Sequence, residues 1–359
     1  MKILYAIQGT GNGHLSRARD IIPILQTKGD IDILVSGTQA DVDLPHEINY
    51  RFKGLSFIFG KNGGVDLLET YKKSNIRKLF KEINSLPVEK YDLVLNDFEP
   101  VSAWACYLKN KECISLSHQA AVLNVNAPQP KHVDVLGRSI LKNYAPTSAQ
   151  YGFHFKSYDK NIFTPVIRQQ IRELDAKNKK HYTVYLPAYD DERIVKILSE
   201  FPKTKWEVFS KHNKKETHLK NISVFPINND AFIQSMANAT GVLCGAGFET
   251  PAEALFLKKK LMVIPMKNQY EQHCNAAALK EIGVPVIKSL KKKHLEKIKD
   301  WIDSDAKITV NYPDHTEKII DMILKKHAVS RAISLGKKIS SEKKFRKITL
   351  KRIMTQLSA

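Results

Sequence analysis

The opening residues of the sequence form a pattern that few folds accommodate. An apolar run at residues 3–7 leads directly into Gly-Thr-Gly-Asn-Gly-His at residues 9–14, and apolar residues then recur at helical spacing up to Leu25. This order predicts a buried strand, a glycine turn and a helix, which is the start of a parallel α/β unit. The backbone N–H groups at the start of such a helix point toward the turn and can bind an anion.

The turn does not fit the dinucleotide-binding fingerprint. That fingerprint requires a third glycine where His14 stands, and an acidic residue at the end of the next strand, where residues 31–36 are followed by Gly37. An imidazole beside an anion site suits proton transfer near neutral pH. We therefore predict that His14 is a general base, with a purely helix-capping role as the alternative.

Short apolar segments alternate with helical patterns along all 359 residues, which predicts an α/β protein with two domains. Strands are expected at residues 2–7, 31–36, 49–53, 92–96, 112–117, 182–186, 206–209, 222–225, 241–244, 261–264 and 284–287. Residues 143–159 are the best candidate for a linker. We expect an N-terminal domain at 1–158, a C-terminal domain at 159–325, and a basic helical segment at 326–359 that can pack back on the first domain.

The sequence lacks the usual signals of membrane, secreted and zinc-binding proteins. No apolar stretch approaches the roughly 20 residues of a transmembrane helix, and the glycine turn interrupts the first apolar run too early for a secretory signal. Four cysteines, at positions 106, 113, 244 and 274, have neither C-x-x-C nor zinc-type spacing. We therefore expect a cytoplasmic protein with no disulfide, no bound metal and no cofactor.

The formal charge of +20 at pH 7 requires an anionic partner or surface. Lysines gather at residues 258–260 and 291–293, and residues 325–352 combine many basic residues with apolar ones at a spacing typical of amphipathic helices. Contact with an anionic membrane surface and a merely solvated helix face both fit this pattern. No nucleic-acid-binding module is recognisable, so no nucleic acid is expected as a partner.

Two further turns follow predicted strands at the edge where α/β folds bind ligands. Asp97 follows the strand at 92–96, and its carboxylate can either fix the tautomer of His14 or cap the next helix. His118 follows the strand at 112–117 and can line the same cleft. Both residues are therefore candidates for the site that contains His14.

The turn after the strand at 241–244 contains the pattern of a helix start. Thr250, Pro251 and Glu253 have the spacing of a capping box, so we predict a helix with Thr250 as its N-cap. The small residues 245–247 before it would allow a diphosphate to approach the helix N-terminus closely.

Three segments of the second half stand in a familiar order. They are residues 245–253, 264–266 (Ile-Pro-Met) and 270–276 (Tyr-Glu-Gln-His-Cys-Asn-Ala). Together they resemble the nucleotide-sugar signature of the GT-B glycosyltransferases, especially the MurG-like and UDP-glucuronosyltransferase-like branch. The turn at 9–14, with Arg17 after it, resembles the G-x-G-H turn of the same enzymes' first domain. The resemblance implies a GT-B fold, with two Rossmann-like domains facing each other across a cleft.

The resemblance also implies a role for each candidate residue. His14 would be the catalytic base and Asp97 its orienting partner. Donor contacts would include Glu253 with the ribose, Thr250 with the diphosphate and Gln272 with the sugar. The full donor set is Gly245, Ala246, Gly247, Thr250, Glu253, Ile227 (through its backbone), Glu271 and Gln272. The acceptor or phosphate set is Gly11, Asn12, Gly13, Gly63, Gly64 and His118.

Two positions depart from the family pattern. Many relatives have a histidine or arginine where Gly245 stands, and Glu249 places an anion close to the expected phosphates. The resemblance still implies a metal-independent hexosyltransferase that uses a nucleotide-sugar donor, UDP-linked in this branch, and an acceptor hydroxyl. The positive charge makes a glycolipid or lipid-linked saccharide at the inner face of the membrane the candidate acceptor. The alternatives are a nucleotide-sugar hydrolase or 2-epimerase, and a non-catalytic nucleic-acid-binding protein.

Overall fold

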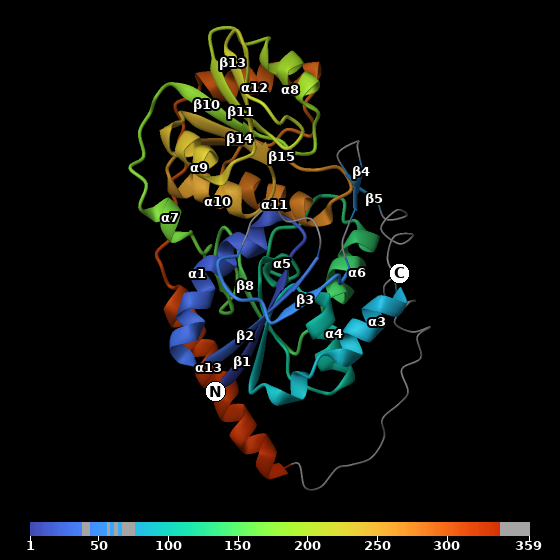
Figure 1. Ribbon diagram of the computed structural model, residues 1–359. Coiled ribbons are helices and arrows are strands. Elements are labelled where there is room, and N and C mark those ends of the chain that lie inside the picture. The colour runs from blue at the N-terminus through green and yellow to red at the C-terminus, as the bar shows by residue number, and fades with distance from the viewer. Residues whose placement is uncertain (38–43, 56–57, 61–63, 67–75, 338–359) are drawn as a thin grey trace.

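The computed structural model describes residues 1–37, 44–55, 58–60, 64–66 and 76–337. Two sheets, each flanked by helices, form two domains stacked one above the other (Figure 1). The expected α/β class and the two Rossmann-like domains are therefore confirmed.

The first domain contains a seven-stranded sheet in which all neighbouring strands are parallel, in the order β3-β2-β1-β6-β7-β8-β9. Its strands are β1 (Lys2–Gln8), β2 (Asp30–Ser36), β3 (Tyr50–Phe52), β6 (Leu93–Asp97), β7 (Ile114–Ser117), β8 (Ala149–Phe153) and β9 (Ile162–Phe163). Its helices are α1 (Asn12–Lys28), α3 (Ile76–Ser85), α4 (Pro100–Leu108), α5 (His118–Val122) and α6 (Val135–Tyr144). A short hairpin, β4 (Ile58–Gly60) with β5 (Gly64–Asp66), lies apart from this sheet.

The predicted linker at 143–159 is wrong, because β8 lies inside it and belongs to the first sheet. Tyr151 and Phe153 on this strand are almost fully buried, and their burial is what fixes the segment in the domain. Since β9 pairs with β8, the sheet also continues past residue 158.

The second domain contains a six-stranded sheet in the order β12-β13-β11-β10-β14-β15, in which only β12 is antiparallel to its neighbour. Its strands are β10 (His181–Tyr185), β11 (Lys205–Ser210), β12 (Thr217–Leu219), β13 (Ile222–Pro226), β14 (Gly241–Gly245) and β15 (Lys260–Ile264). Its helices are α7 (Gln169–Arg172), α8 (Asp191–Leu198), α9 (Asn229–Asn238), α10 (Glu249–Phe256), α11 (Tyr270–Glu281) and α12 (Leu295–Asp303).

The strand predicted at 284–287 is not formed. A single parallel bridge joins Val286 to Val263, and Ile287 donates a hydrogen bond to the carbonyl of Val263. Pro285 has no N–H group and cannot extend a ladder, so the pairing stops after one bridge.

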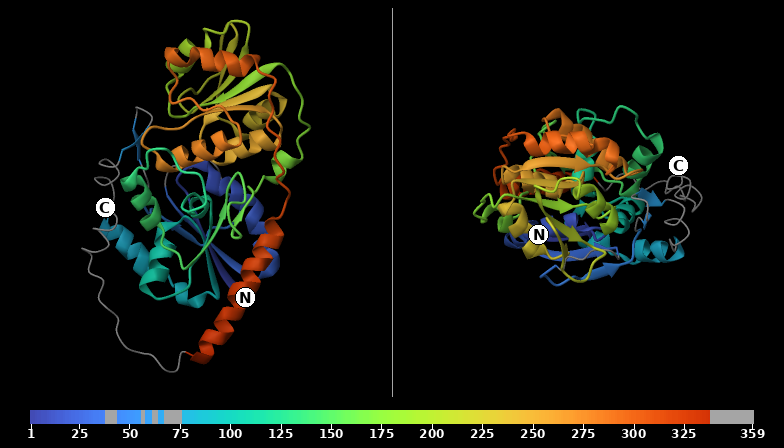
Figure 2. Two further views of the ribbon diagram at one scale, coloured as in Figure 1. Left: turned by 180° about the vertical axis from the view of Figure 1, so that it is seen from behind. Right: turned by 90° about the horizontal axis from the view of Figure 1, so that it is seen from above.

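Within the described residues, the chain crosses between the domains at residues 164–168 and again at 304–315, and then forms α13 (Thr316–Lys337) against the first domain (Figure 2). Lys28 at the end of α1 pairs with Glu317 and Asp321, at 2.7 and 3.0 Å. The returning helix thus begins at Thr316, before residue 326. Among the described residues, no helix is long and apolar enough to cross a membrane.

The two crossings run side by side. Residues from both line one cavity of about 240 Å³, and the guanidinium of Arg172 donates to the carbonyl of Tyr312 at 3.0 Å. Tyr312 in turn donates from its hydroxyl to the carbonyl of Phe155 in the first domain.

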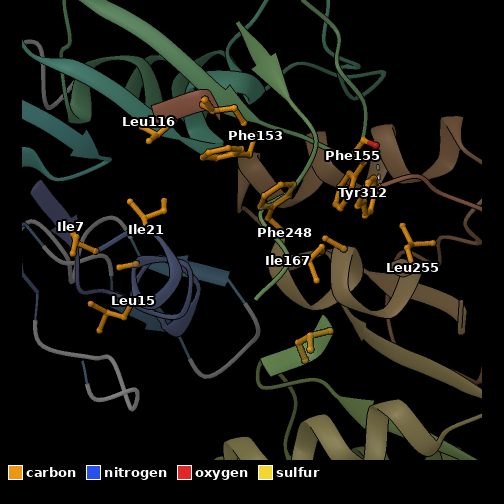
Figure 3. Packing of buried hydrophobic residues seen from close by; sticks show 14 of the residues in the cluster. Ile7, Leu15, Ile21, Leu116, Phe153, Phe155, Ile167, Phe248, Leu255 and Tyr312 are labelled. Carbon is orange, nitrogen blue, oxygen red and sulfur yellow. Dashed lines mark hydrogen bonds between the residues drawn. The ribbon is translucent and has the colours of Figure 1, made fainter. Parts of the chain in front are cut away.

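One cluster of buried hydrophobic residues extends from the first domain into the second (Figure 3). Ile7 and Leu15 belong to its first-domain part, and Phe248 and Leu255 to its second-domain part. Phe155 packs on Phe248 with ring centroids 5.2 Å apart. Because burial of apolar surface stabilises contact between the domains, this cluster fixes how the carboxyl ends of the two sheets face each other.

Candidate active site

The turn between β1 and α1 has the geometry that the glycines predict. Gly11 precedes the helix with φ of +92°, a conformation that favours glycine, and a side chain there would have no neighbour within 4 Å. The helix starts at Asn12 without a side-chain cap. The first turn of α1 therefore presents backbone N–H groups and His14 at the carboxyl edge of the first sheet.

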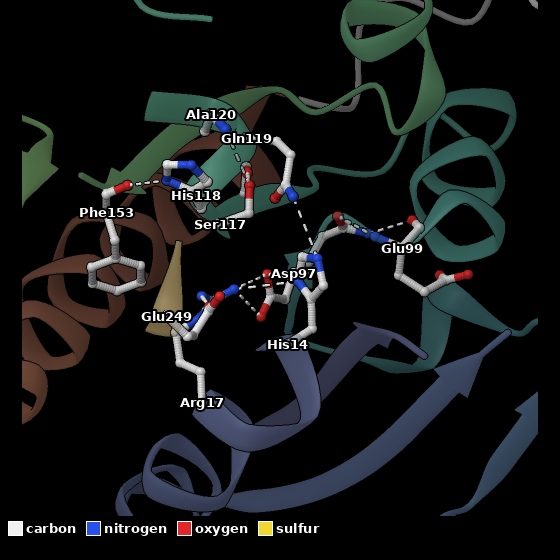
Figure 4. Close-up of polar contacts among 12 residues, drawn as sticks. His14, Arg17, Asp97, Glu99, Ser117, His118, Gln119, Ala120, Phe153 and Glu249 are labelled. Carbon is white, nitrogen blue, oxygen red and sulfur yellow. Dashed lines mark hydrogen bonds and ion pairs between the residues drawn. The ribbon is translucent and has the colours of Figure 1, made fainter. Parts of the chain in front are cut away.

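His14 and Asp97 form the predicted pair. Nδ1 of His14 lies 2.8 Å from Oδ1 of Asp97, which is fully buried (Figure 4). The carboxylate accepts a hydrogen bond from the N–H group at Nδ1, so the lone pair of the neutral imidazole is on Nε2. Burial alone would lower the pKa of His14, but Asp97 outweighs burial and raises the pKa above its ordinary value.

The two capping alternatives do not hold. Helix α4, which follows Asp97, is capped by Glu99, whose carboxylate accepts from the N–H groups of Val101 and Ser102 at 2.7 and 2.6 Å. No side chain caps helix α1, so His14 does not act as a helix cap. Both residues are free for the interaction that joins them.

Arg17 is a functional residue whose role sequence reasoning missed. Its Nη2 atom donates to both carboxylate oxygens of Asp97, at 2.7 and 2.8 Å, and its side chain is 1% exposed. Burial raises the pKa of Asp97, but Arg17 and His14 outweigh burial and hold that pKa below its usual range. The available signal was the spacing of His14 and Arg17, because residues three apart share one face of a helix.

Arg17 also connects the two domains. Its Nη1 atom pairs with the carboxylate of Glu249, the first residue of α10. A side chain at Gly13 would come within 2.5 Å of the same carboxylate, so a larger residue there would displace the Glu249 side chain. The charge of Glu249, which the sequence placed near the expected phosphates, is thus paired with the same guanidinium that bonds to Asp97.

Helix α10 begins two residues earlier than predicted, at Glu249 instead of Pro251, and the expected capping box is absent. Phe248 is the residue before the helix, it makes no side-chain cap, and Thr250 lies inside the first turn. Phe248 stacks on His118 with ring centroids 3.9 Å apart, which fixes the helix start. The first N–H groups of α10 therefore have no side-chain acceptor from a cap, as an anion site requires.

The side chain of Glu253 bonds to Arg168 and not to the backbone at the start of the helix, as a capping box would require. Its carboxylate accepts from Nε and Nη2 of Arg168, at 2.5 and 2.9 Å, and the residue is 2% exposed. A buried charge needs a partner, and Arg168, far away in sequence, supplies it. The sequence contained no local signal for this pair.

The glycine turn after β14 is open beside Gly247, where a side chain would have no neighbour within 4 Å. Gln272 lies against the turn, since its Oε1 is 3.7 Å from where a side chain at Gly245 would begin. The same oxygen accepts from the N–H of Met266 at 2.9 Å. The structure therefore brings together Gly245, Ala246, Gly247, Thr250 and Gln272.

Further contacts between the domains involve α5 and α11. Gln119 donates to Glu271 at 3.0 Å, and its Nε2 lies 3.4 Å from Nε2 of His14. His118 is only 1% exposed, and its two nitrogens lie 2.8 Å from the carbonyl of Phe153 and 2.7 Å from Oδ1 of Asn275. Contrary to the prediction, His118 does not line an accessible surface but joins the two domains.

The remaining candidates lie outside this group. The N–H of Ile227 donates to the carbonyl of Ser210 at 2.9 Å. Gly64 belongs to the β4–β5 hairpin and pairs with Gly60. Gly63 lies outside the described residues.

Two Rossmann-like domains, with a histidine–aspartate pair at a glycine turn where they meet, define the GT-B fold. A comparison with protein families gives the particular family. The chain belongs to glycosyl transferase family 1, whose model matches residues 1–304. The family resemblance predicted from the motifs is therefore confirmed.

Several solved structures have the same fold at low sequence identity. MurG of Acinetobacter baumannii is 15% identical, with a TM-score of 0.53, over 90% of this chain and 99% of that one. UGT89C1 of Arabidopsis thaliana is 11% identical, with a TM-score of 0.56, over 91% and 94%. UGT2 of Phytolacca americana is 12% identical, with a TM-score of 0.54, over 92% and 94%. Comparison with curated proteins gives no significant match.

Proposed function

We propose that this glycosyltransferase moves a hexosyl group from a UDP-linked sugar to an acceptor hydroxyl, without a metal ion or a cofactor. Structural relatives were solved with UDP, with UDP-L-rhamnose and with UDP-2-fluoro-glucose, which supports a nucleotide-sugar donor. One observation carries the proposal: the Arg17–Glu249 contact holds the His14–Asp97 pair of one domain against the uncapped start of α10 in the other.

The proposed reaction requires a base, a leaving-group site and an electrostatic partner. The acceptor hydroxyl transfers its proton to Nε2 of His14 as its oxygen bonds to the anomeric carbon, and the bond from that carbon to the diphosphate breaks. Asp97 stabilises the imidazolium that forms. The N–H groups at the start of α10 stabilise the negative charge on the departing diphosphate.

Each donor-binding residue contacts a different part of the nucleotide-sugar. Gly245, Ala246, Gly247 and Thr250 hold the diphosphate, and Gln272 and Glu271 contact the sugar. The backbone of Ile227 contacts the base. Glu253 binds the ribose through the lone pairs that Arg168 leaves free. Gly11, Asn12 and Gly13 form the acceptor side, with the loop at Gly63 and Gly64.

Thermal shift measurements test the donor site without knowledge of the acceptor. UDP at 100 times its Kd is expected to stabilise the protein by about 2.7 kcal/mol, whereas uridine, which lacks the diphosphate, stabilises it far less at the same concentration. Gly247→Leu should fold, because there is free space beside Gly247, and should lose the UDP shift because the leucine fills that space. If UDP, GDP and TDP all leave the melting temperature of the wild type unchanged, the nucleotide-sugar proposal is wrong.

We place the acceptor on a glycolipid or lipid-linked saccharide, with the protein bound peripherally at the inner face of the cell membrane. The charge of +20 supports this placement. We expect sedimentation with phosphatidylglycerol vesicles at low salt, release at high salt, and no sedimentation with phosphatidylcholine vesicles. Absence of binding to anionic vesicles at low salt would contradict the membrane placement and leave the donor site untouched.

A further inference from the structure

A basic cavity lies at the edge of the second sheet opposite the candidate active site. Its volume is about 480 Å³, and it is formed where the chain enters β10, β14 and β15 and leaves α12. The loop that joins α7 to β10 (Figure 1) contributes Leu174, Ala176, Lys177 and Asn178 to the lining. The polar residues that line the cavity are Lys177, Asn178, Thr240, Lys258, Lys259 and Lys307.

Hydrogen bonds fix the walls of this cavity. Thr240 donates from its hydroxyl to Oδ1 of Asn178 at 2.7 Å, and the N–H of Lys177 donates to the carbonyl of Ala237 at 3.0 Å. Nζ of Lys259 donates to the carbonyl of Lys177 at 2.6 Å. These bonds join the loop after α7 to the segments before β14 and β15. The lysines therefore line a cavity whose walls are held together by hydrogen bonds.

The cavity carries positive charge that the described residues do not neutralise. Its lining contains four lysines and no acidic residue. Lys177 pairs with Asp175 on the exposed rim at 3.0 Å, whereas Lys258, Lys259 and Lys307 have no carboxylate within 4 Å in the described part of the chain. Lys259 is only 6% exposed, and burial together with the nearby Lys307 lowers its pKa to about 8.

We propose that this cavity binds a phosphorylated anion. Lysines that line one cavity suit the compact, multiply charged oxygens of a phosphoryl group. Hydroxyl and amide groups of Thr240 and Asn178 provide further polar contacts, and Leu257 and Phe256 give the cavity an apolar side. The inference concerns a second site, remote from the sugar-transfer chemistry, and does not depend on it.

Calorimetric titration with inorganic pyrophosphate tests this site. The Gly247→Leu background excludes the candidate donor site from the signal. We expect saturable one-to-one binding that weakens by about tenfold or more, a loss of about 1.4 kcal/mol, in Lys259→Gln/Lys307→Gln. Lys258→Gln/Lys307→Gln changes only exposed lysines, so it should fold and show the same loss.

The matched control is Lys291→Gln/Lys293→Gln, which removes the same charge from a lysine cluster that does not line the cavity. It should leave the affinity for pyrophosphate within about twofold. Equal weakening in all three variants, or no saturable binding in the background protein, overturns the proposal.

Vesicles distinguish a lipid headgroup from a soluble phosphate as the source of the anion. If the headgroup is the ligand, phosphatidylglycerol vesicles bind less to the cavity variants than to the control, and pyrophosphate competes with them. If the ligand is soluble, the cavity variants lose pyrophosphate binding while their binding to vesicles equals that of the control.

Discussion

Replacement of His14 by alanine is expected to reduce the rate of sugar transfer by about 10²- to 10⁴-fold, the contribution of a well-placed general base. The loss arises because no other described side chain pairs with Asp97 and also leaves a nitrogen lone pair for the acceptor hydroxyl. The affinity for UDP should stay within about twofold, since His14 belongs to the opposite domain from the diphosphate turn. Steady-state kinetics and calorimetry with UDP measure the two quantities.

Asp97→Asn serves as the comparison for His14→Ala. Because Asp97 raises the pKa of His14, the neutral base of the wild type accumulates only above that raised value, and the rate should rise with pH through a midpoint above 6.5. The asparagine variant should be slower and should have its midpoint at lower pH. If His14→Ala lost UDP affinity by as large a factor as it lost rate, the separation of the base from the donor site would be contradicted.

Arg17→Leu is expected to lower the free energy of unfolding by about 3–5 kcal/mol, the cost of leaving a buried charge without its partner. Asp97 is fully buried, and Arg17 bonds to both of its oxygens. Scanning calorimetry should show the loss as a lower temperature of the first unfolding transition.

Two further variants separate the roles of Arg17. Glu249→Gln removes only the charge that pairs with Arg17 across the domains, and Glu249 is 23% exposed, so we expect a loss of at most about 1 kcal/mol. Arg17→Lys keeps the charge but cannot provide the planar fork, so its stability should fall between those of the leucine variant and the wild type. A leucine variant as stable as Glu249→Gln would show that Asp97 does not depend on Arg17.

Local patterns in the sequence predicted most of the fold. Ten of the eleven expected strands formed, because short apolar segments followed by turns are sufficient for buried parallel strands. Residues 284–287 have the same composition but contain Pro285 at the edge of the sheet, and a single bridge results. The linker prediction failed because polar residues around β8 concealed a strand that only tertiary packing reveals.

The candidate site was predictable only where a motif carries it. The positions of His14, Asp97 and the turn at 245–247 follow from strand ends that the sequence displays. The partners Arg17 and Arg168 act on carboxylates 80 and 85 residues away. The spacing of His14 and Arg17 places those two residues on one helix face, but no local pattern identifies the carboxylates that Arg17 and Arg168 bind. The capping box at Thr250 was a local pattern that the packing of Phe248 overrode.

The pair of adjacent crossings between the domains limits the motions available to the molecule. Two adjacent crossings restrict sliding and twisting of one domain against the other. The main motion that remains is a hinge rotation about an axis through the two crossings. Any such opening separates Arg17 from Glu249, because they belong to opposite domains. The free-energy difference between open and closed forms therefore includes the strength of this one ion pair. When a donor binds, its negative diphosphate lies near Glu249 and changes that free-energy difference.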